Sequence, residues 1–347
     1  MEAGTSLTDN PCNFAAFKSS VMLCIERDYT NPYFNIAAEE YVLRELTDDV
    51  FMLWRNNPCI IVGKHQNTLA EINIDYVTRH DIPVVRRITG GGTVFHDLGN
   101  LNFTFVQNGK PEDLVNFRKF TEPIIEVLRN LGVEAKFEGR NDLTVKGKKF
   151  SGNAEHVHKN RVLHHGTLLF SAQLGSLTDA LKVNPEKFSD KAVKSIRSRV
   201  TNLSEHLPKE MDVLVFKEKI LDHIKRKHPE MKVTRFSDDD IKKINELADK
   251  KYKTWEWNFG YSPKYNFSTT VKANGGNIQY HLEVKNGIIE QARIFGDYFS
   301  MLETAEIEKM LVNVQHDRKA ISEKLKDVEI EKYFKNVTLE EFVNGMF

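Results

Sequence analysis

The sequence is poor in several features that mark particular classes of protein. Of its 347 residues only three are cysteines, and Cys12, Cys24 and Cys59 form no C-x-x-C pair. This excludes a disulfide framework and a cysteine zinc site, and it indicates a reducing compartment. No apolar run reaches membrane-spanning length, so we expect no membrane contact. Lysine plus arginine equals aspartate plus glutamate at 49 each, which argues against general nucleic-acid binding.

The first residues also lack the signature of a targeting segment. Residues 1–20 contain one basic residue, Lys18, and two acids, Glu2 and Asp9. Signal and transit peptides are basic or apolar and poor in acids. If the protein works in an organelle, we therefore expect this to be the processed chain.

The rest of the composition, 40% hydrophobic and 28% charged, is that of a soluble globular protein long enough for two domains. Apolar spacing predicts a first set of elements, with strands 51–54 and 59–63 paired and all strands in one mixed sheet. These are helices at 36–43, 74–80 and 115–131 and strands at 51–54, 59–63, 133–137, 142–145, 148–151 and 163–170. A more helical region is predicted to begin at residues 177–181 and 185–189. A mobile basic loop is predicted at 187–199, and two helices at 211–228 and 238–252.

The character of the chain changes after an aromatic segment at residues 255–263. Three alternating strands joined by Asn-Gly turns are predicted next, followed by three helices. Their ranges are 265–272, 278–284 and 288–295, then 305–312, 318–325 and 339–347. The sequence thus predicts an α/β (α+β) fold with a catalytic domain at 1–262 and a small α+β domain at 263–347.

The most distinctive stretch is Arg86-Arg87-Ile88-Thr89-Gly90-Gly91-Gly92-Thr93-Val94-Phe95-His96-Asp97-Leu98-Gly99-Asn100. Strand-forming residues flank it, so we interpret it as a glycine-rich hairpin. Glycines let the backbone approach a ligand closely, and successive N–H groups can form an anion-binding nest. The two arginines add charge and donor forks for phosphate or carboxylate. The stretch is neither a P-loop nor a Rossmann fingerprint.

Three further clusters gain meaning beside this stretch. They are Gly139-Arg140-Asn141-Asp142-Leu143, Lys148-Lys149-Phe150-Ser151-Gly152-Asn153-Ala154 and His164-His165-Gly166-Thr167-Leu168-Leu169. Each alone is an ordinary turn or strand end, and adjacent histidines on a strand face opposite sides. Together they suggest a nucleotide site in which Asp142 could hold Mg²⁺ or a ribose hydroxyl. Lys149 could then stabilise charge that develops in acyl transfer.

The order of these clusters resembles the lipoate–protein ligase and lipoyltransferase family from about Asn31 onward. Further matching segments are Asn35 to Glu40, Ser195 to Val200 and Trp255 to Gly260. The chain looks most similar to the animal mitochondrial lipoyltransferase. That likeness implies a mitochondrial matrix location, with a chain that lacks its transit peptide.

The resemblance implies a mixed-sheet core related to biotin ligases and class II aminoacyl-tRNA synthetases. It implies that Lys149 is catalytic and contacts the acyl-phosphate junction of lipoyl-adenylate, the substrate. The residues implied to bind lipoyl-adenylate are Arg87, Thr89, Gly90, Gly91, Gly92, Thr93, Val94, Phe95, Asn141, Asp142, Ser151, Gly152, His165, Gly166, Thr167, Lys182 and Lys194, the last two in a closing loop at 182–195. The implied partners are lipoyl domains of 2-oxoacid dehydrogenase E2 subunits and the glycine-cleavage H protein. We expect a monomer with no resident metal.

One departure from the family pattern concerns the activation step. Ligases of this family that make the adenylate from ATP typically carry an aromatic-Arg or Gln-Arg pair where this chain has Glu155 and His156. An acid there would repel departing pyrophosphate. We therefore expect transfer from preformed lipoyl-adenylate, with two alternatives open: a complete ATP-dependent ligase, or a transferase that takes the acyl group from a lipoylated carrier protein.

Readings from other classes fit less well. A biotin ligase would carry a basic Gly-Arg-Gly-type loop, and an octanoyl transferase would need a cysteine near the cavity, whereas none lies beyond Cys59. A non-catalytic acyl-carrier-binding module would keep the glycine turn without needing Lys149.

Overall fold

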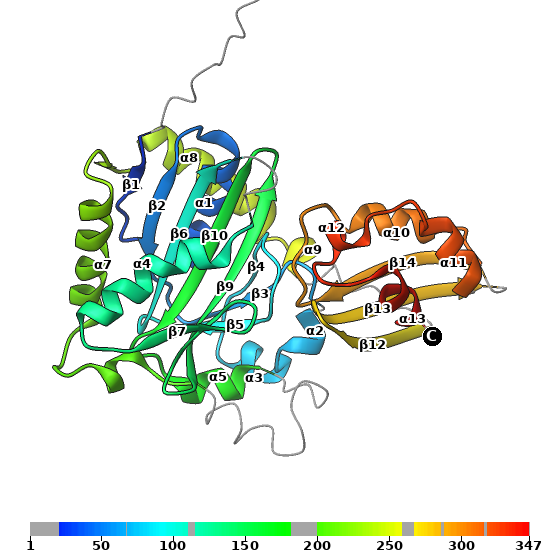
Figure 1. The fold of residues 1–347 in the computed structure, drawn as a ribbon, viewed down its shortest axis with the longest axis horizontal. Coiled ribbons are helices and arrows are strands. Elements are labelled where there is room, and N and C mark those ends of the chain that lie inside the picture. Colours follow the sequence, from blue (N-terminus) through cyan, green and yellow to red (C-terminus); the bar gives the residue numbers. More distant parts are fainter. Residues whose placement is uncertain are drawn as a thin grey trace, which may run out of the picture.

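The computed structural model describes residues 21–66, 68–109, 115–181, 200–258, 267–285, 288–315 and 318–346. Two α/β bodies lie side by side, the larger one ending in α9 and the smaller one beginning with β12 (Figure 1). The predicted boundary at residues 262 and 263 lies outside the described residues. No helix in the described ranges is long and apolar enough to span a membrane.

The larger body is built on an eight-stranded mixed sheet with the order β11-β1-β2-β6-β10-β9-β8-β7. β1 runs parallel to β2 and β11, and the other neighbours are antiparallel. The strands are β1 (Leu23–Ile25), β2 (Val50–Trp54), β6 (Asn100–Asn108), β7 (Ala135–Glu138), β8 (Asp142–Val145), β9 (Lys148–His158), β10 (Arg161–Leu169) and β11 (Lys232–Thr234).

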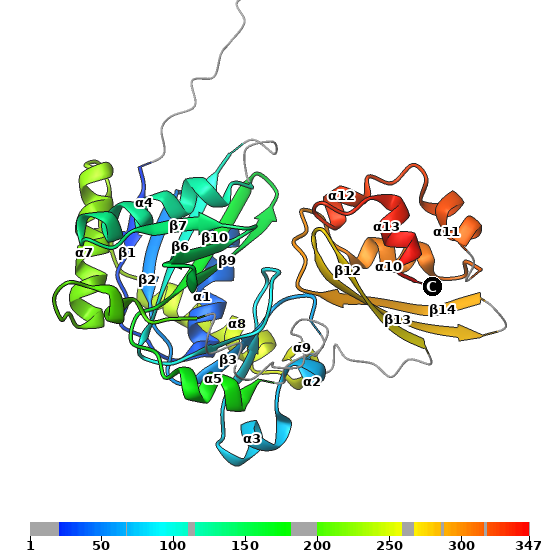
Figure 2. The ribbon, with the colours of Figure 1, turned by 60° about the horizontal axis from the view of Figure 1, so that its bottom comes forward.

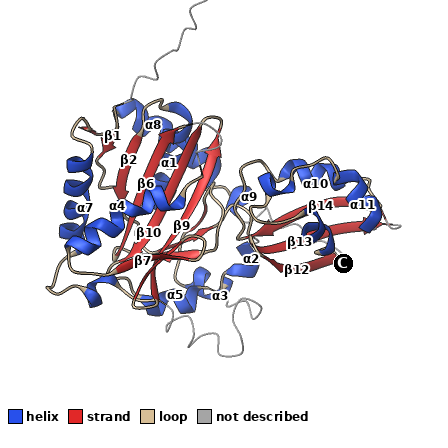
Figure 3. Ribbon diagram, viewed as in Figure 1, coloured by secondary structure: helices blue, strands red, loops and turns tan. Residues whose placement is uncertain are grey.

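Helices cover both faces of this sheet (Figures 1 and 3). α4 (Phe117–Asn130) and α7 (Val213–Lys227) pack on one face through a core that includes Phe51, Phe105 and Phe216. α1 (Pro32–Glu45) and α8 (Asp238–Leu247), with the π-turn Ala248–Tyr252, cover the other face. Burial of these apolar stripes is the main force that holds the layers together.

A second, three-stranded sheet flanks the α1 face, with the order β4-β3-β5. β3 (Cys59–Val62) is parallel to β4 (Val84–Arg86) and antiparallel to β5 (Val94–His96). The predicted pairing of residues 51–54 with 59–63 is therefore wrong, because β2 and β3 belong to different sheets. Four short helices complete this side of the body: α2 (Thr68–Glu71), α3 (Ile74–Arg79), α5 (Leu174–Ala180) and α9 (Trp255–Asn258).

The smaller body is an antiparallel sheet whose one face carries helices (Figure 2). Its strands are β12 (Phe267–Ala273), β13 (Gly276–Lys285) and β14 (Ile288–Gly296), and its helices are α10 (Ala305–Leu311), α11 (Arg318–Leu325), α12 (Ile330–Tyr333) and α13 (Leu339–Asn344). Its core is separate from those of the larger body. The fold class, a mixed α/β core with a small α+β C-terminal body, is the one that the sequence predicted.

Candidate active site

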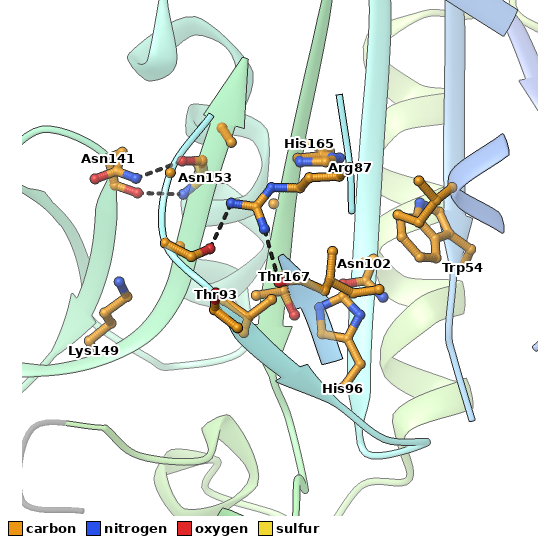
Figure 4. A pocket seen from close by; sticks show the side chains of 18 residues that line it. Trp54, Arg87, Thr93, His96, Asn102, Asn141, Lys149, Asn153, His165 and Thr167 are labelled. Atoms are coloured by element: carbon orange, nitrogen blue, oxygen red, sulfur yellow. Dashed lines mark hydrogen bonds between the residues drawn. The ribbon is translucent and has the colours of Figure 1, made fainter. Parts of the chain in front are cut away.

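A cavity of about 150 Å³ lies on the α1 face of the main sheet, under the segment that joins β4 to β5 (Figure 4). One wall comes from β6, β9 and β10, and the opposite wall from the small sheet and α1. The lining residues are Ile36, Trp54, Ile61, Arg87, Gly91, Gly92, Thr93, Val94, His96, Asn102, Asn141, Lys149, Gly152, Asn153, Ala154, His165, Gly166 and Thr167.

The segment between β4 and β5, residues 87–93, is a loop that crosses the end of β3, and we call it the glycine loop. The predicted hairpin is wrong, because β4 and β5 each pair with β3 and not with each other. Lys64 N–H donates to the Thr89 carbonyl at 2.8 Å, which seats the loop on the residues after β3. Gly91 has φ of +90°, a backbone conformation that favours glycine.

The two arginines before the glycines both donate hydrogen bonds to backbone carbonyls of the protein. Arg86 is fully buried and donates to the carbonyls of Gly63, Gln66 and Trp257, among others. The predicted phosphate-facing role of Arg86 is therefore wrong. Arg87 lines the cavity, but its Nη2 donates to the carbonyls of Gly90 at 2.7 Å and Gly92 at 2.8 Å. Burial lowers the pKa of Arg87 to about 10, so the side chain stays charged near pH 7. Its hydrogen bonds to Gly90 and Gly92 hold the glycine loop in place.

A chain of hydrogen bonds links the glycine loop to the floor of the cavity. His165 Nε2 lies 2.8 Å from Thr89 Oγ1, and its Nδ1 lies 2.9 Å from both carboxylate oxygens of Glu39. Glu39 also accepts from Thr104, which accepts from the Trp54 indole N–H. His165 thus connects Thr89 of the glycine loop to Glu39 of α1 through its two ring nitrogens.

Lys149 stands at the polar end of the cavity. Its side chain is 40% exposed, and its Nζ lies 2.7 Å from Asp142 Oδ1. A Cβ on Gly152 would lie 3.3 Å from this Nζ. The absence of a side chain at Gly152 therefore leaves room for the Lys149 side chain. Asn141 and Asn153 exchange side-chain-to-carbonyl hydrogen bonds of 2.6 and 3.0 Å, which fasten the start of β8 to β9.

A bulge in β9 decides which residues share the cavity with Lys149. Leu143 pairs with Ser151 but Thr144 pairs with Lys149, so Phe150 is the extra residue. In a regular strand Lys149, Ser151 and Glu155 would share one face; the bulge shifts the alternation by one residue.

The face opposite the cavity therefore receives Ser151, which is buried and does not line the cavity, and Glu155. Glu155 pairs with buried His164 at 2.8 Å, and His164 stacks on the α4 side with Phe103 and Phe120. The expectation that Glu155 would repel pyrophosphate in the site is therefore wrong.

The structure brings most of the predicted site residues together. Those that line the cavity are Arg87, Gly91, Gly92, Thr93, Val94, Asn141, Lys149, Gly152, His165, Gly166 and Thr167. Thr89 and Asp142 adjoin it through His165 and Lys149. Gly90 touches the smaller body instead, where a Cβ would meet the Tyr298 carbonyl, and Phe95 packs with the apolar residues around α3. Lys182, Lys194 and the predicted closing loop at 182–195 lie outside the described residues.

Sequence reasoning missed the inner end of the cavity. The lining residues it did not select are Ile36, Trp54, Ile61, His96, Asn102, Asn153 and Ala154. His96 lies within the distinctive stretch, and Asn102 lies just beyond its end at Asn100. Their place in the segment that follows the glycines was the signal that could have found them.

The cavity thus has apolar side chains in part of its lining, Lys149 at its polar end and the glycine loop along one side. Residues 31–225 match the lipoyl protein ligase A/B catalytic domain, and residues 262–346 match the bacterial lipoate protein ligase C-terminus. The chain is 43% identical over 334 residues to the lipoate-protein ligase LplJ of Bacillus subtilis, covering 94% of this chain and 100% of that protein.

Three solved structures are similar over most of their length. P. falciparum LipL1 in complex with lipoate has a TM-score of 0.76 at 25% identity and covers 93% of this chain and 97% of its own. A bipartite lipoate protein ligase studied with its E2 lipoyl domain from Thermoplasma acidophilum has a TM-score of 0.63 at 29% identity, covering 72% and 100%. A lipoate-protein ligase A bound with ATP has a TM-score of 0.60 at 26% identity, covering 69% and 99%.

The chain therefore belongs to the lipoyl protein ligase A/B family and is an enzyme. The predicted family and the prediction of an enzyme are confirmed. The relative at 43% identity is a bacterial ligase, so the comparisons support the ligases of this family rather than the animal mitochondrial lipoyltransferase. The adenylate-binding roles of the individual residues stay predictions.

Proposed function

We propose that this enzyme is a complete, ATP-dependent lipoate–protein ligase. In the first step a carboxylate oxygen of lipoate attacks the α-phosphorus of Mg-ATP, and the bond to pyrophosphate breaks. In the second step an acceptor lysine amine attacks the carbonyl carbon of lipoyl-adenylate. The bond to the phosphate oxygen then breaks, AMP leaves, and the amine loses its proton to give an amide.

The observation that carries the proposal is the division of the cavity into two chemically different ends. Ile36, Trp54, Ile61 and Val94 supply an apolar inner end that suits an acyl chain. At the other end the exposed ammonium of Lys149 faces the place where the adenylate junction would lie, under the glycine loop. A fixed positive group there stabilises the oxygen that gains charge in both steps.

The face occupied by Glu155 supports activation from ATP as well as transfer. With Glu155 turned to His164 on the opposite face, the side chain that lines the cavity at this point of β9 is Ala154. Asp142, with its second carboxylate oxygen outside the Lys149 pair, could hold the Mg²⁺ that arrives with ATP. The related ligase solved with ATP, together with LplJ, favours the complete ligase over a transferase that depends on preformed adenylate.

The acceptor is proposed to be a lysine on a lipoyl domain of a 2-oxoacid dehydrogenase E2 subunit, with the glycine-cleavage H protein as a second acceptor. The related ligase described with its E2 lipoyl domain supports the first of these. The mitochondrial location stays a prediction.

The test is lipoate-dependent exchange between ATP and labelled pyrophosphate, measured beside transfer to a purified lipoyl domain. A complete ligase exchanges pyrophosphate only when lipoate is present and lipoylates the domain from lipoate and Mg-ATP. Transfer from synthetic lipoyl-adenylate without exchange would overturn the activation step and leave a transferase.

A further inference from the structure

The backbone of Lys149 lies where β9 has run past the end of one of its two neighbouring strands. The pairing of β9 with β10 ends at Ser151, which is opposite Leu168. On the other side the pairing continues, and Thr144 of β8 is opposite Lys149. Strands of the main sheet alone would therefore leave Lys149 on an open edge, where N–H and C=O groups have no partner.

A segment from later in the chain, residues 200–206, lies against this open edge, and we call it the clamp. Val200 forms a parallel bridge with Lys149. The N–H of Thr201 donates to the Lys149 carbonyl at 3.0 Å. The clamp thus gives Lys149 the backbone partner that β10 gives the later residues of β9.

The clamp is itself held by side chains. Thr201 is 2% exposed, and its Oγ1 donates to Glu205 Oε2 at 3.2 Å and lies 2.9 Å from His206 Nε2. Asn202 exchanges hydrogen bonds of 2.9 and 3.0 Å with the N–H and the carbonyl of Ala172, which follows β10. The backbone of Thr201 is therefore fixed by its own hydroxyl and by the residue after it.

The clamp meets β9 at the bulge. Bulges beside active sites commonly re-aim a side chain. The extra residue, Phe150, is fully buried in the core on the α4 side, so packing fixes one side of the bulge. The hydrogen bond from Thr201 fixes the carbonyl of Lys149 just before it. These two anchors set the direction in which the Lys149 side chain leaves β9, and with it the place of Nζ beside Asp142.

We propose that Thr201 is a positioning residue for acyl transfer, which acts through Lys149 by holding its carbonyl. The inference rests on the proposed function, in which Lys149 stabilises the oxygen that gains charge. A displacement of such a group by about 1 Å can cost about 10²-fold in rate. Thr201 does not line the cavity, so its replacement should slow transfer and leave the affinity for lipoyl-adenylate unchanged.

The first experiment measures single-turnover transfer from synthetic lipoyl-adenylate to a purified lipoyl domain. Thr201→Val keeps the shape of the side chain and removes Oγ1. It should slow transfer about tenfold, because the clamp loses the contacts of this hydroxyl with Glu205 and His206. Thr201→Ser restores the hydroxyl and should return the rate close to that of the wild type.

Thr121→Val is the matched control for this experiment. Thr121 is also buried, and its hydroxyl donates to the Phe117 carbonyl within α4, away from Lys149. This variant should transfer at the wild-type rate, and calorimetry should give one affinity for lipoyl-adenylate in all four proteins. Equal rates for Thr201→Val and Thr121→Val would overturn the proposal. A loss that Thr201→Ser does not restore, or one explained by weaker adenylate binding, would overturn it as well.

The second experiment asks whether Thr201 acts through Lys149. In the Lys149→Ala background there is no ammonium to position, so Thr201→Val should cause no further loss of transfer. The same loss in both backgrounds would reveal a general structural effect and overturn the proposal. An enzyme that transfers from lipoyl-adenylate but exchanges no pyrophosphate would refute the proposed activation step alone, because neither experiment uses ATP.

Discussion

Replacing Gly90 with alanine should separate the two bodies at the point where the smaller one touches the glycine loop. A Cβ on Gly90 would lie 2.3 Å from the carbonyl oxygen of Tyr298 and 3.5 Å from the Cα of Phe299. Ordinary contact begins near 3.4 Å, so one side must move by about 1 Å. The obstacle is backbone, which cannot swing away as a side chain does. Overpacking of this kind costs about 1–3 kcal/mol.

The assay is amide hydrogen exchange at Gly296, whose N–H donates to the carbonyl of His65 across the same contact. If the cost falls on the contact between the bodies, exchange at Gly296 should rise about fivefold to a hundredfold in Gly90→Ala. Gly92→Ala is the matched control, because neither glycine has a positive φ and a Cβ on Gly92 meets nothing within 4 Å. The amide of Phe105, in the main sheet, should exchange at the wild-type rate in both variants. Equal exchange at Gly296 in the two variants would refute the reasoning.

Three further outcomes follow from the site. Lys149→Ala should slow transfer from lipoyl-adenylate by about 10²–10³ with an unchanged circular dichroism spectrum; a rate within threefold of wild type would remove its role. Glu155→Gln should change pyrophosphate exchange by less than threefold, because Glu155 pairs with His164 away from the cavity; a tenfold rise would restore the repulsion argument. Stability should fall as the pH drops from 7 to 5: burial holds the pKa of His65 and His96 below 6.5, so the unfolded chain binds protons that the native one does not. Below pH 6.5, each of these two histidines then lowers the free energy of unfolding by about 1.4 kcal/mol per pH unit. A thermal midpoint that stays level from pH 7 to pH 5 would contradict this.

The sequence predicted the elements better than their pairing. The apolar run at 59–63 predicts a strand, and the structure has β3 at Cys59–Val62. Nothing local in that run says that its neighbours are β4 and β5 and not β2, because pairing is settled by how distant segments pack. The short strands β1 and β11 were missed because three residues give too little alternation to identify a strand.

In the candidate site, the sequence motifs predicted which segments meet but not which face of β9 each side chain occupies. The motifs predicted that the glycine loop, Lys149 and His165 share one site, and all three line the same cavity. They also placed Glu155 there, because it stands where the ligases of the family carry a residue of the activation site. The extra residue Phe150 is visible only in the register with β8, and it turns Glu155 to the other face.

The hydrogen bonds of Arg86 to α9 determine when the glycine loop can form during protein synthesis. Its guanidinium and backbone are held by the carbonyls of Trp257 and Asn258 and by the Asn258 side chain. All the residues that line the cavity precede residue 168, yet the base of the glycine loop stays incomplete until α9 has left the ribosome. A fragment ending at residue 225, the end of the catalytic-domain match, would contain the whole cavity lining but only the acceptors of Arg86 at residues 63 to 68, and not those in α9. During synthesis the nascent chain should therefore acquire its glycine loop late, well after every residue of that loop has emerged.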